Sequence, residues 1–195
     1  LEDRLRIYSD AASASDDPKL LMVRRVVRDL IREGRKVLVF SKFTDTVDVV
    51  RDFLSLWLGV DKVGTYTGRG GQVWDSEEGI WRICDKEEVR RALEEKVDVL
   101  VCSDAASEGL NLHAASAVVN VDMPWNPAKV EQRIGRVDRI GQLSEKVKVV
   151  NVWYPETYEA RMYRVLFDRR RIWWIIVGPA SGIICLLYTS PSPRD

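Results

Sequence analysis

Apolar residues recur at helical spacing near the start of the chain. Between Pro18 and Gly34 they fall at every third or fourth position, with charged residues between them: Leu20, Leu21, Val23, Val26, Val27, Leu30 and Ile31. Asp17 is a good helix N-cap, Pro18 suits the first helical position, and Gly34 suits the residue after a helix. The pattern predicts an amphipathic helix that starts at Pro18 and ends near Gly34.

Short strand-like runs alternate with such helical stripes. A strand that is buried on both faces has a continuous apolar run rather than an alternating one. The segments that fit strands are Val37–Phe40, Val60–Thr67, Val97–Cys102, Ala117–Val121 and Val147–Trp153. Strands that alternate with helices over short connections indicate an α/β fold, in which a parallel sheet has helices on both faces.

Two further helices carry terminal signals. Thr44 is the predicted cap of a helix that Gly59 ends, and the apolar stripe of this helix consists of Val47, Val50, Phe53, Leu54 and Trp57. Asp85 followed by Glu88 is the predicted capping box of a helix that runs through Glu95. These signals predict where each helix begins.

The segment between two of the strands has no clear period. Gly68–Gly71 predicts a flexible loop, and its glycine spacing does not match a dinucleotide-binding fingerprint. Residues 74–82 predict a long loop or a small hairpin. Trp74 and Trp81 in this polar stretch either stack on a base or a partner protein, or pack within the loop.

The most informative stretch runs from Asn126 to Gly141. Asn126 and Pro127 predict a helix start, and Gly141 predicts its end. At about 100° per residue, one face of this helix is apolar and consists of Val130, Ile134 and Val137. The opposite face is polar and consists of Gln132, Arg136 and Arg139, with Arg133 at its flank. The sequence therefore predicts a helix that buries one side and presents guanidinium groups on the other.

Arginines at this spacing suit an oligophosphate or a nucleic-acid backbone. Guanidinium is planar and always charged, and it forks onto phosphate oxygens. The alternative is a solvated charged face with Glu131 and Asp138 as ion-pair partners. Gly135 within the predicted helix costs about 1 kcal/mol relative to alanine, which indicates that another group approaches the backbone there.

Composition limits the alternatives. Thirty Lys and Arg residues balance 30 Asp and Glu residues in a chain of 195 residues, so any polyanion site must be local. Cys84, Cys102 and Cys185 are odd in number and lack metal-binding spacing, which favours a reducing cytoplasm and no metal site. The length allows one domain with a tail. The chain starts at Leu1 rather than at Met, and we interpret it as a fragment.

Two motifs resemble a known family. Residues 132–142 read Gln-Arg-Ile-Gly-Arg-Val-Asp-Arg-Ile-Gly-Gln, which resembles motif VI of superfamily 2 helicases in its Snf2-like form, and residues 122–127 before them are typical of that group. Residues 103–112 resemble motif V. Their Ser-Glu-Gly-Leu-Asn form is most similar to bacterial RapA-like enzymes and to the DISARM phage-defence helicase. The resemblance spans Pro18 to Phe167 and implies a RecA-like fold, the second and C-terminal lobe of two.

The resemblance implies a motor that holds ATP with Mg²⁺ in the cleft between two lobes. The first lobe would carry the phosphate loop and the magnesium carboxylate. By position, Arg136 and Arg139 match the arginine fingers that the second lobe supplies to the γ-phosphate, and Gln132 matches the nucleotide-facing residue beside them. The track would be nucleic acid, with double-stranded DNA as the expectation from this family.

The other implied site residues follow strands. Asp104 is implied near the ribose or in a coupling network, and Gly109 lets the backbone approach the nucleotide closely. Ser103, again with Gly109, is implied toward the nucleic-acid backbone. Lys42, in a stretch that resembles motif IV, and Gly68 are further implied nucleic-acid contacts. A helix cap is the alternative for Ser103 and Asp104, and a plain surface lysine is the alternative for Lys42.

The motifs of the first lobe do not occur in the sequence. It contains no G-x-x-x-x-G-K-[S/T] phosphate loop and no magnesium-binding acidic motif after a strand. We therefore expect the chain alone neither to hydrolyse ATP nor to translocate, and its parent protein to be an ATP-dependent helicase or translocase. The alternative is a non-enzymatic RecA-like module that docks a partner and uses the arginine row to hold protein carboxylates.

The chain divides into four predicted segments. Residues 1–17 are a linker or frayed terminus, 18–168 the helicase C-terminal RecA-like domain, 169–182 a partial continuation of the family pattern, and 183–195 a disordered tail of unrelated, non-native sequence. Residues 156–170 predict a helix. The uncharged run 172–188 is a poor membrane anchor because it is short and holds glycines and a proline, so no membrane is expected.

Overall fold

The computed structural model describes residues 17–104, 112–124, 127–137, 142, 144, 146–154 and 157, and the backbone of 174–177 and 184–191. The elements in chain order are α2 (Pro18–Arg32), β1 (Val37–Ser41), α3 (Thr44–Leu58), the 3₁₀ helix η1 (Val60–Lys62), β2 (Val63–Thr67), β3 (Gly70–Asp75), β4 (Ile80–Cys84), α4 (Lys86–Glu95), β5 (Val99–Ser103), β6 (Ala117–Asn120), α5 (Pro127–Ile134), β7 (Lys146–Trp153), β8 (Trp174–Val177) and β9 (Ile184–Pro191). The predicted alternation of strands and helices is confirmed.

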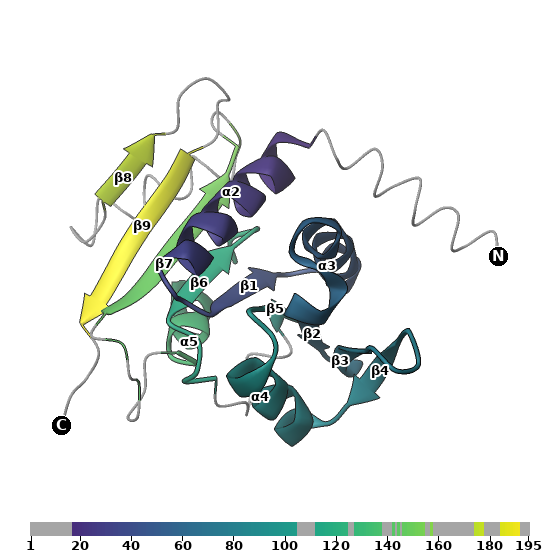
Figure 1. Cartoon of the computed structure of the whole chain (residues 1–195). Coiled ribbons are helices and arrows are strands. Elements are labelled where there is room, and N and C mark those ends of the chain that lie inside the picture. The colour runs from purple at the N-terminus through teal and green to yellow at the C-terminus, as the bar shows by residue number, and fades with distance from the viewer. Residues whose placement is uncertain are drawn as a thin grey trace.

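All of these strands lie in one sheet, in the order β4-β3-β2-β5-β1-β6-β7-β9-β8 (Figure 1). The five central strands, β2, β5, β1, β6 and β7, pair in parallel. Each side of the sheet is extended by antiparallel strands, β3 and β4 on one side and β9 and β8 on the other. The predicted parallel sheet is therefore its centre, and its borders are antiparallel.

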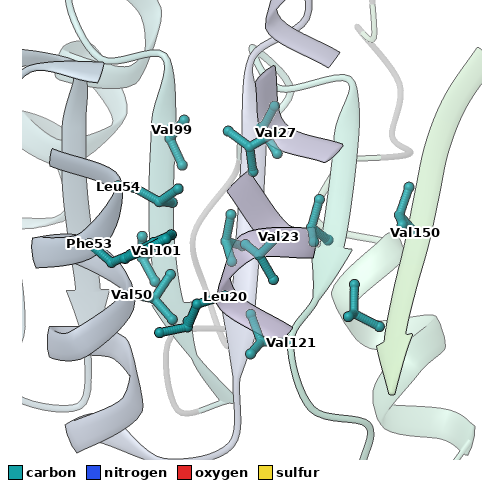
Figure 2. Packing of buried hydrophobic residues seen from close by; sticks show 14 of the residues in the cluster. Leu20, Val23, Val27, Val50, Phe53, Leu54, Val99, Val101, Val121 and Val150 are labelled. Carbon is teal, nitrogen blue, oxygen red and sulfur yellow. The ribbon is translucent and has the colours of Figure 1, made fainter. Parts of the chain in front are cut away.

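Helices cover both faces of the sheet, as predicted. Val37 and Val39 of β1 pack in one cluster with side chains of α2 and α3, and Figure 2 shows Val23 and Leu54 from those helices in that cluster. Leu38 and Phe40 point to the other face, where they join side chains of α4. Because side chains alternate along a strand, an unbroken apolar run indicates two covered faces.

The predicted helix ends are largely confirmed. The Asp17 carboxylate accepts hydrogen bonds from the amides of Lys19 and Leu20. The reciprocal capping box of Asp85 and Glu88 is present at α4. The prediction that Thr44 caps α3 is wrong, because Phe43 holds the cap position without a side-chain bond.

The segment between β2 and α4 is more ordered than predicted. Gly70 and Gly71 lie in β3 rather than in a loop, and β3 and β4 form the hairpin that was one of the two predictions for residues 74–82. The Trp74 and Trp81 rings meet edge to face with centroids 5.4 Å apart. The Arg51 guanidinium lies 4.9 Å from the Trp81 ring centroid. These contacts are packing within the domain, the second of the two interpretations of the tryptophans.

Gly71 allows α4 to lie against β3. A Cβ atom added at Gly71 would stand 2.1 Å from Cγ2 of Val89, a fully buried side chain of α4. We expect Gly71→Ala to lower the free energy of unfolding by about 3 kcal/mol, because an added methyl in a packed core forces its neighbours to move. Urea denaturation measures the change.

Val89→Ala provides the control, because it removes the colliding methyl. The structure predicts that Gly71→Ala costs less than about 1 kcal/mol in a Val89→Ala background. An equal cost in both backgrounds would show that the contact with α4 is not the cause.

The structure corrects the prediction for the C-terminal tail. Residues 184–191 were predicted to be disordered, but they form β9, which pairs antiparallel with β7 along eight residue pairs from Lys146↔Pro191 to Trp153↔Ile184. The backbone of β7 supplies hydrogen bonds that composition does not reveal, so the disorder prediction is wrong for this stretch. The predicted boundaries at 17/18, 168/169 and 182/183 remain predictions. The predicted helix at 156–170 lies outside the described residues except for Thr157.

No helix in the described part of the chain has the length and apolar character needed to cross a membrane.

Candidate functional site

Several of the predicted site residues lie where central parallel strands end. Ser103 ends β5 and Asp104 follows it, Lys42 follows β1, and Gly68 follows β2. Ser41 and Ser103 are register partners on adjacent strands. The carboxyl edge of an open α/β sheet is where ligands bind in such folds, so the predicted residues gather at a suitable place.

Arg133 of α5 contacts several of the residues at this edge and is fully buried. Its Nε donates to Oδ1 of Asp104 at 2.7 Å, and its Nη2 lies 2.5 Å from the same oxygen. Its Nη1 donates to Oδ1 of Asn120 at 2.8 Å and to the backbone carbonyl of Asp122 at 2.9 Å. One side chain therefore holds the segments that follow β5 and β6.

Arg133 lies over a row of side chains that crosses the sheet. Cys102, Phe40, Asn120 and Asn151 are register partners on the neighbouring strands β5, β1, β6 and β7. The Arg133 guanidinium lies 5.3 Å from the Phe40 ring centroid, and Asn120 Nδ2 donates to Asn151 Oδ1 at 2.6 Å. A buried charge needs partners. Asp104, Asn120 and the aromatic ring supply them, and Asn151 in turn holds Asn120.

Asp122 shapes the loop after β1. Its Oδ2 accepts a hydrogen bond of 2.5 Å from the Ser41 hydroxyl, and its Oδ1 accepts one of 2.6 Å from the Lys42 amide. The Ser41 hydroxyl in turn accepts from the Phe43 amide at 3.3 Å. Because Arg133 binds the Asp122 carbonyl, the loop after β1 connects through Asp122 to α5.

Helix α5 is shorter than predicted, and this changes the setting of Arg136. Helix α5 ends at Ile134, and residues 135–137 form turns rather than continuing the helix to Gly141. Arg136 is therefore half-buried in a turn, and its carbonyl accepts a hydrogen bond of 3.3 Å from the Leu112 amide. Gln132 is exposed, as predicted. The prediction of a continuous arginine-bearing helix face is thus wrong, because the helix ends at Ile134, before Arg136.

The expected close approach at Gly135 is also not found among the described residues. A Cβ atom there would meet only backbone oxygens of the preceding turn, those of Glu131 at 3.2 Å and Gln132 at 3.7 Å. Gly135 directly follows the last residue of α5. The glycine therefore accompanies the helix end rather than a contact with another element.

The remaining predicted residues differ in exposure. The Ser103 hydroxyl is buried and has no hydrogen-bond partner among the described residues, while Lys42 and Gly68 are exposed. The Lys42 ammonium lies 5.1 Å from the Phe43 ring centroid. Arg139 and Gly109 lie outside the described residues.

Sequence reasoning missed the importance of Arg133, Asn120, Asn151 and Asp122. Helical periodicity placed Arg133 at the flank of the exposed face, whereas its side chain has 0% exposure. A signal was present: Asn120 and Asn151 each interrupt an apolar strand run. A polar residue at a fully buried strand position indicates a buried polar partner.

Cys102, at this edge of the sheet, is poorly suited to act as a nucleophile. Burial raises the pKa of the Cys102 thiol far above its usual range, and the opposing effect of Arg133 is smaller. A thiol held in its protonated form is a poor nucleophile. In the described part of the chain, no group of three or more His, Cys, Asp or Glu side chains is placed to hold a metal ion.

Comparison with known proteins identifies similar sequences. The sequence model of the helicase conserved C-terminal domain matches residues 19–141. The ATP-dependent helicase YqhH of Bacillus subtilis is 28% identical over 184 residues, which cover 94% of this chain and 30% of that protein. The RNA polymerase-associated protein RapA of Pectobacterium atrosepticum is 46% identical over 71 residues, which cover 36% of this chain and 7% of that protein. The chain thus spans less than a third of the length of these relatives.

A solved structure with the same fold is the SWI2/SNF2 ATPase core of Sulfolobus solfataricus in complex with double-stranded DNA. It superposes with a TM-score of 0.59 at 24% identity, over 78% of this chain and 30% of that one. The similarity shows that the sheet and its covering helices have the RecA-like arrangement of a helicase lobe.

Proposed function

The chain belongs to the helicase conserved C-terminal domain family, in its Snf2-like group, and we propose on this premise that it is the second motor lobe of an ATP-dependent DNA translocase. The observation that carries the proposal is the junction at Arg133. This residue ties the segments after β5 and β6 to the turn that holds Arg136. A lobe that works between a nucleotide and a nucleic acid needs its contact loops on one rigid support.

Arg136 and Arg139 would act as the arginine fingers, and Gln132 would face the nucleotide beside them. Arg136 lies two residues after α5. Its amide donates to the Arg133 carbonyl and its carbonyl accepts from the Leu112 amide, so its backbone is held from two sides. In phosphoryl transfer, positioned cations neutralise charge on the transferring group and provide most of the catalysis. Asp104 and Gly109 would lie next to the nucleotide at the same edge of the sheet.

The edge suits the phosphates of ATP better than its magnesium ion. Guanidinium groups are donors for phosphate oxygens. The Asp104 and Asp122 carboxylates already accept hydrogen bonds from Arg133 and from the loop after β1. This arrangement supports a division in which Mg²⁺ binds to carboxylates of the first lobe. Bound ATP would supply the γ-phosphoryl group whose transfer to water drives movement.

Ser103, Lys42 and Gly68 would contact the nucleic-acid backbone. The Ser103 hydroxyl at the end of β5 is a buried donor that no described residue binds, and such a group is costly unless something binds it. Lys42 and Gly68 are exposed beside it on the same sheet edge. Double-stranded DNA is the proposed track, because the Sulfolobus core with the same fold is bound to it.

Lobe complementation tests the proposal. The purified chain is mixed with a separately purified first lobe of a Snf2-like relative, and steady-state ATP hydrolysis is measured with and without double-stranded DNA. We expect no turnover from either part alone and DNA-stimulated turnover from the mixture. A chain that binds the first lobe yet gives no turnover would instead support the docking module.

The proposal extends to the cellular setting. The Ser-Glu-Gly-Leu-Asn form at residues 107–111 supports a place among bacterial cytoplasmic motors of the RapA or phage-defence type. Loss of phage resistance on deletion of the gene would distinguish the second type from the first.

A further inference from the structure

We propose that Arg133 is a positioning residue that links the nucleic-acid side of the sheet edge to Arg136; this rests on the proposed function. Its guanidinium joins two segments: it binds Asp104 after β5, and it binds both Asn120 at the end of β6 and Asp122 just beyond it. No other described arginine has a fully buried side chain. Because it is buried, Arg133 does not contact a ligand itself.

The first half of the link runs from Arg133 to the loop after β1. Arg133 holds the Asp122 carbonyl, and the Asp122 carboxylate holds the Ser41 hydroxyl and the Lys42 amide. Lys42 is one of the proposed nucleic-acid contacts. Two hydrogen bonds therefore connect this loop to Arg133, one from the Lys42 amide to Asp122 and one from Arg133 to Asp122, so a displacement of the loop is passed on to Arg133.

The second half runs from Arg133 to Arg136. The Arg136 amide donates to the Arg133 carbonyl at 3.3 Å, and the Leu112 amide donates to the Arg136 carbonyl at 3.3 Å. The position of Arg133 in the last turn of α5 thus determines where the turn that holds Arg136 begins. A guanidinium displaced by about 1 Å from a transferring phosphoryl group loses about 10²-fold in rate.

On its sheet side, Arg133 binds Asn120, which is buried away from the surface. Asn120 and Asn151 are both fully buried, and Asn120 hydrogen bonds to Arg133 and Asn151. Asn120→Ala therefore loosens Arg133 without altering the surface that a nucleotide or a nucleic acid touches. This variant serves as a second, milder probe beside Arg133→Lys.

The first experiment is a double-mutant cycle in the complementation assay. Arg133→Lys and Asn120→Ala should each lower kcat by about 10- to 100-fold with KM for ATP changed less than about threefold, because they displace a group that acts in the transition state. In an Arg136→Ala background neither change should lower the rate further. Fully multiplicative losses, or an unchanged kcat in both single variants, would overturn the proposal.

The second experiment does not depend on ATP hydrolysis. Amide hydrogen exchange is measured by NMR in the chain alone, with circular dichroism as the check of folding. Arg133→Lys should speed exchange at Lys42 and Leu112 by about tenfold or more, while the Glu88 amide in the α4 capping box stays unchanged. Arg90→Met, which removes a surface arginine paired with Glu87 and Glu94, should change neither Lys42 nor Leu112.

The two experiments separate the failure of each proposal. If the wild-type mixture has no ATPase activity, the motor proposal fails, and the exchange data alone decide whether Arg133 links the two segments. If the mixture is active and exchange at Lys42 and Leu112 is unaffected by Arg133→Lys, Arg133 does not link the two segments. The positioning role of Arg133 is then wrong, while the motor proposal stands.

Discussion

Replacing Arg136 with alanine is expected to lower the ATPase rate of the complemented two-lobe enzyme by about 10³- to 10⁵-fold. The reason is electrostatic: an arginine that neutralises charge on the transferring phosphoryl group stabilises the transition state more than bound ATP. The loss should therefore appear in kcat more than in the affinity for a non-hydrolysable ATP analogue. Single-turnover measurements separate the two quantities.

Arg136→Lys tests whether geometry as well as charge matters. Lysine keeps the charge but lacks the planar fork that binds two phosphate oxygens. We expect this variant to recover less than about a tenth of the wild-type rate. Arg90→Ala is the matched control on α4, where the side chain pairs with Glu87 and Glu94 at the surface, and its rate should match the wild type within about twofold.

A near-normal rate for Arg136→Ala would favour the docking alternative. In that case the arginines would hold carboxylates of a partner, and binding to the first lobe would weaken while turnover per bound complex remained. Measuring both the affinity between the lobes and the rate at saturating lobe concentration therefore distinguishes a motor lobe from a docking module.

Removing Arg133 is expected to destabilise the domain strongly. Arg133→Met should lower the free energy of unfolding by about 3 kcal/mol, because removal of one partner of a buried ion pair leaves the other uncompensated. Its side chain is 0% exposed, and that of Asp104 is 15% exposed. Partial hydration of Asp104 places the cost at the lower end of the range for buried pairs. Chemical denaturation followed by circular dichroism measures it.

Two comparisons isolate the buried pair. Arg51→Met removes another arginine that stacks on an aromatic ring and pairs with carboxylates, but Asp48 and Asp52 are more exposed, at 30% and 23%. We expect it to cost about 1 kcal/mol. The double variant Arg133→Met with Asp104→Asn should be less destabilised than the sum of the single variants, since it leaves no unpaired charge. Additive losses would show that packing rather than charge dominates at Arg133.

Much of the architecture followed from local rules. The apolar runs at Val37–Phe40 and Ala117–Val121 predicted central strands because a strand covered on both faces has no polar alternate positions. Asp17 and the Asp85–Glu88 pair predicted helix starts because capping satisfies backbone amides a few residues away. The motifs at 103–112 and 132–142 identified the family. These signals depend on neighbours in sequence, so the sequence alone contains them.

The tertiary structure determined which strands and which side chains pair with each other. Periodicity treated residues 126–141 as one helix and placed Arg133 at the margin of its exposed face, but α5 ends at Ile134 and Arg133 points inward. Asn120 and Asn151 come from strands 31 residues apart in sequence, and only the sheet register sets them side by side beneath Arg133. Likewise β7 determined that residues 184–191 form a strand. The sequence therefore predicted the residue types that suit phosphate chemistry. The buried network beneath them depends on pairing between strands that are far apart in sequence, and local patterns do not predict such pairing.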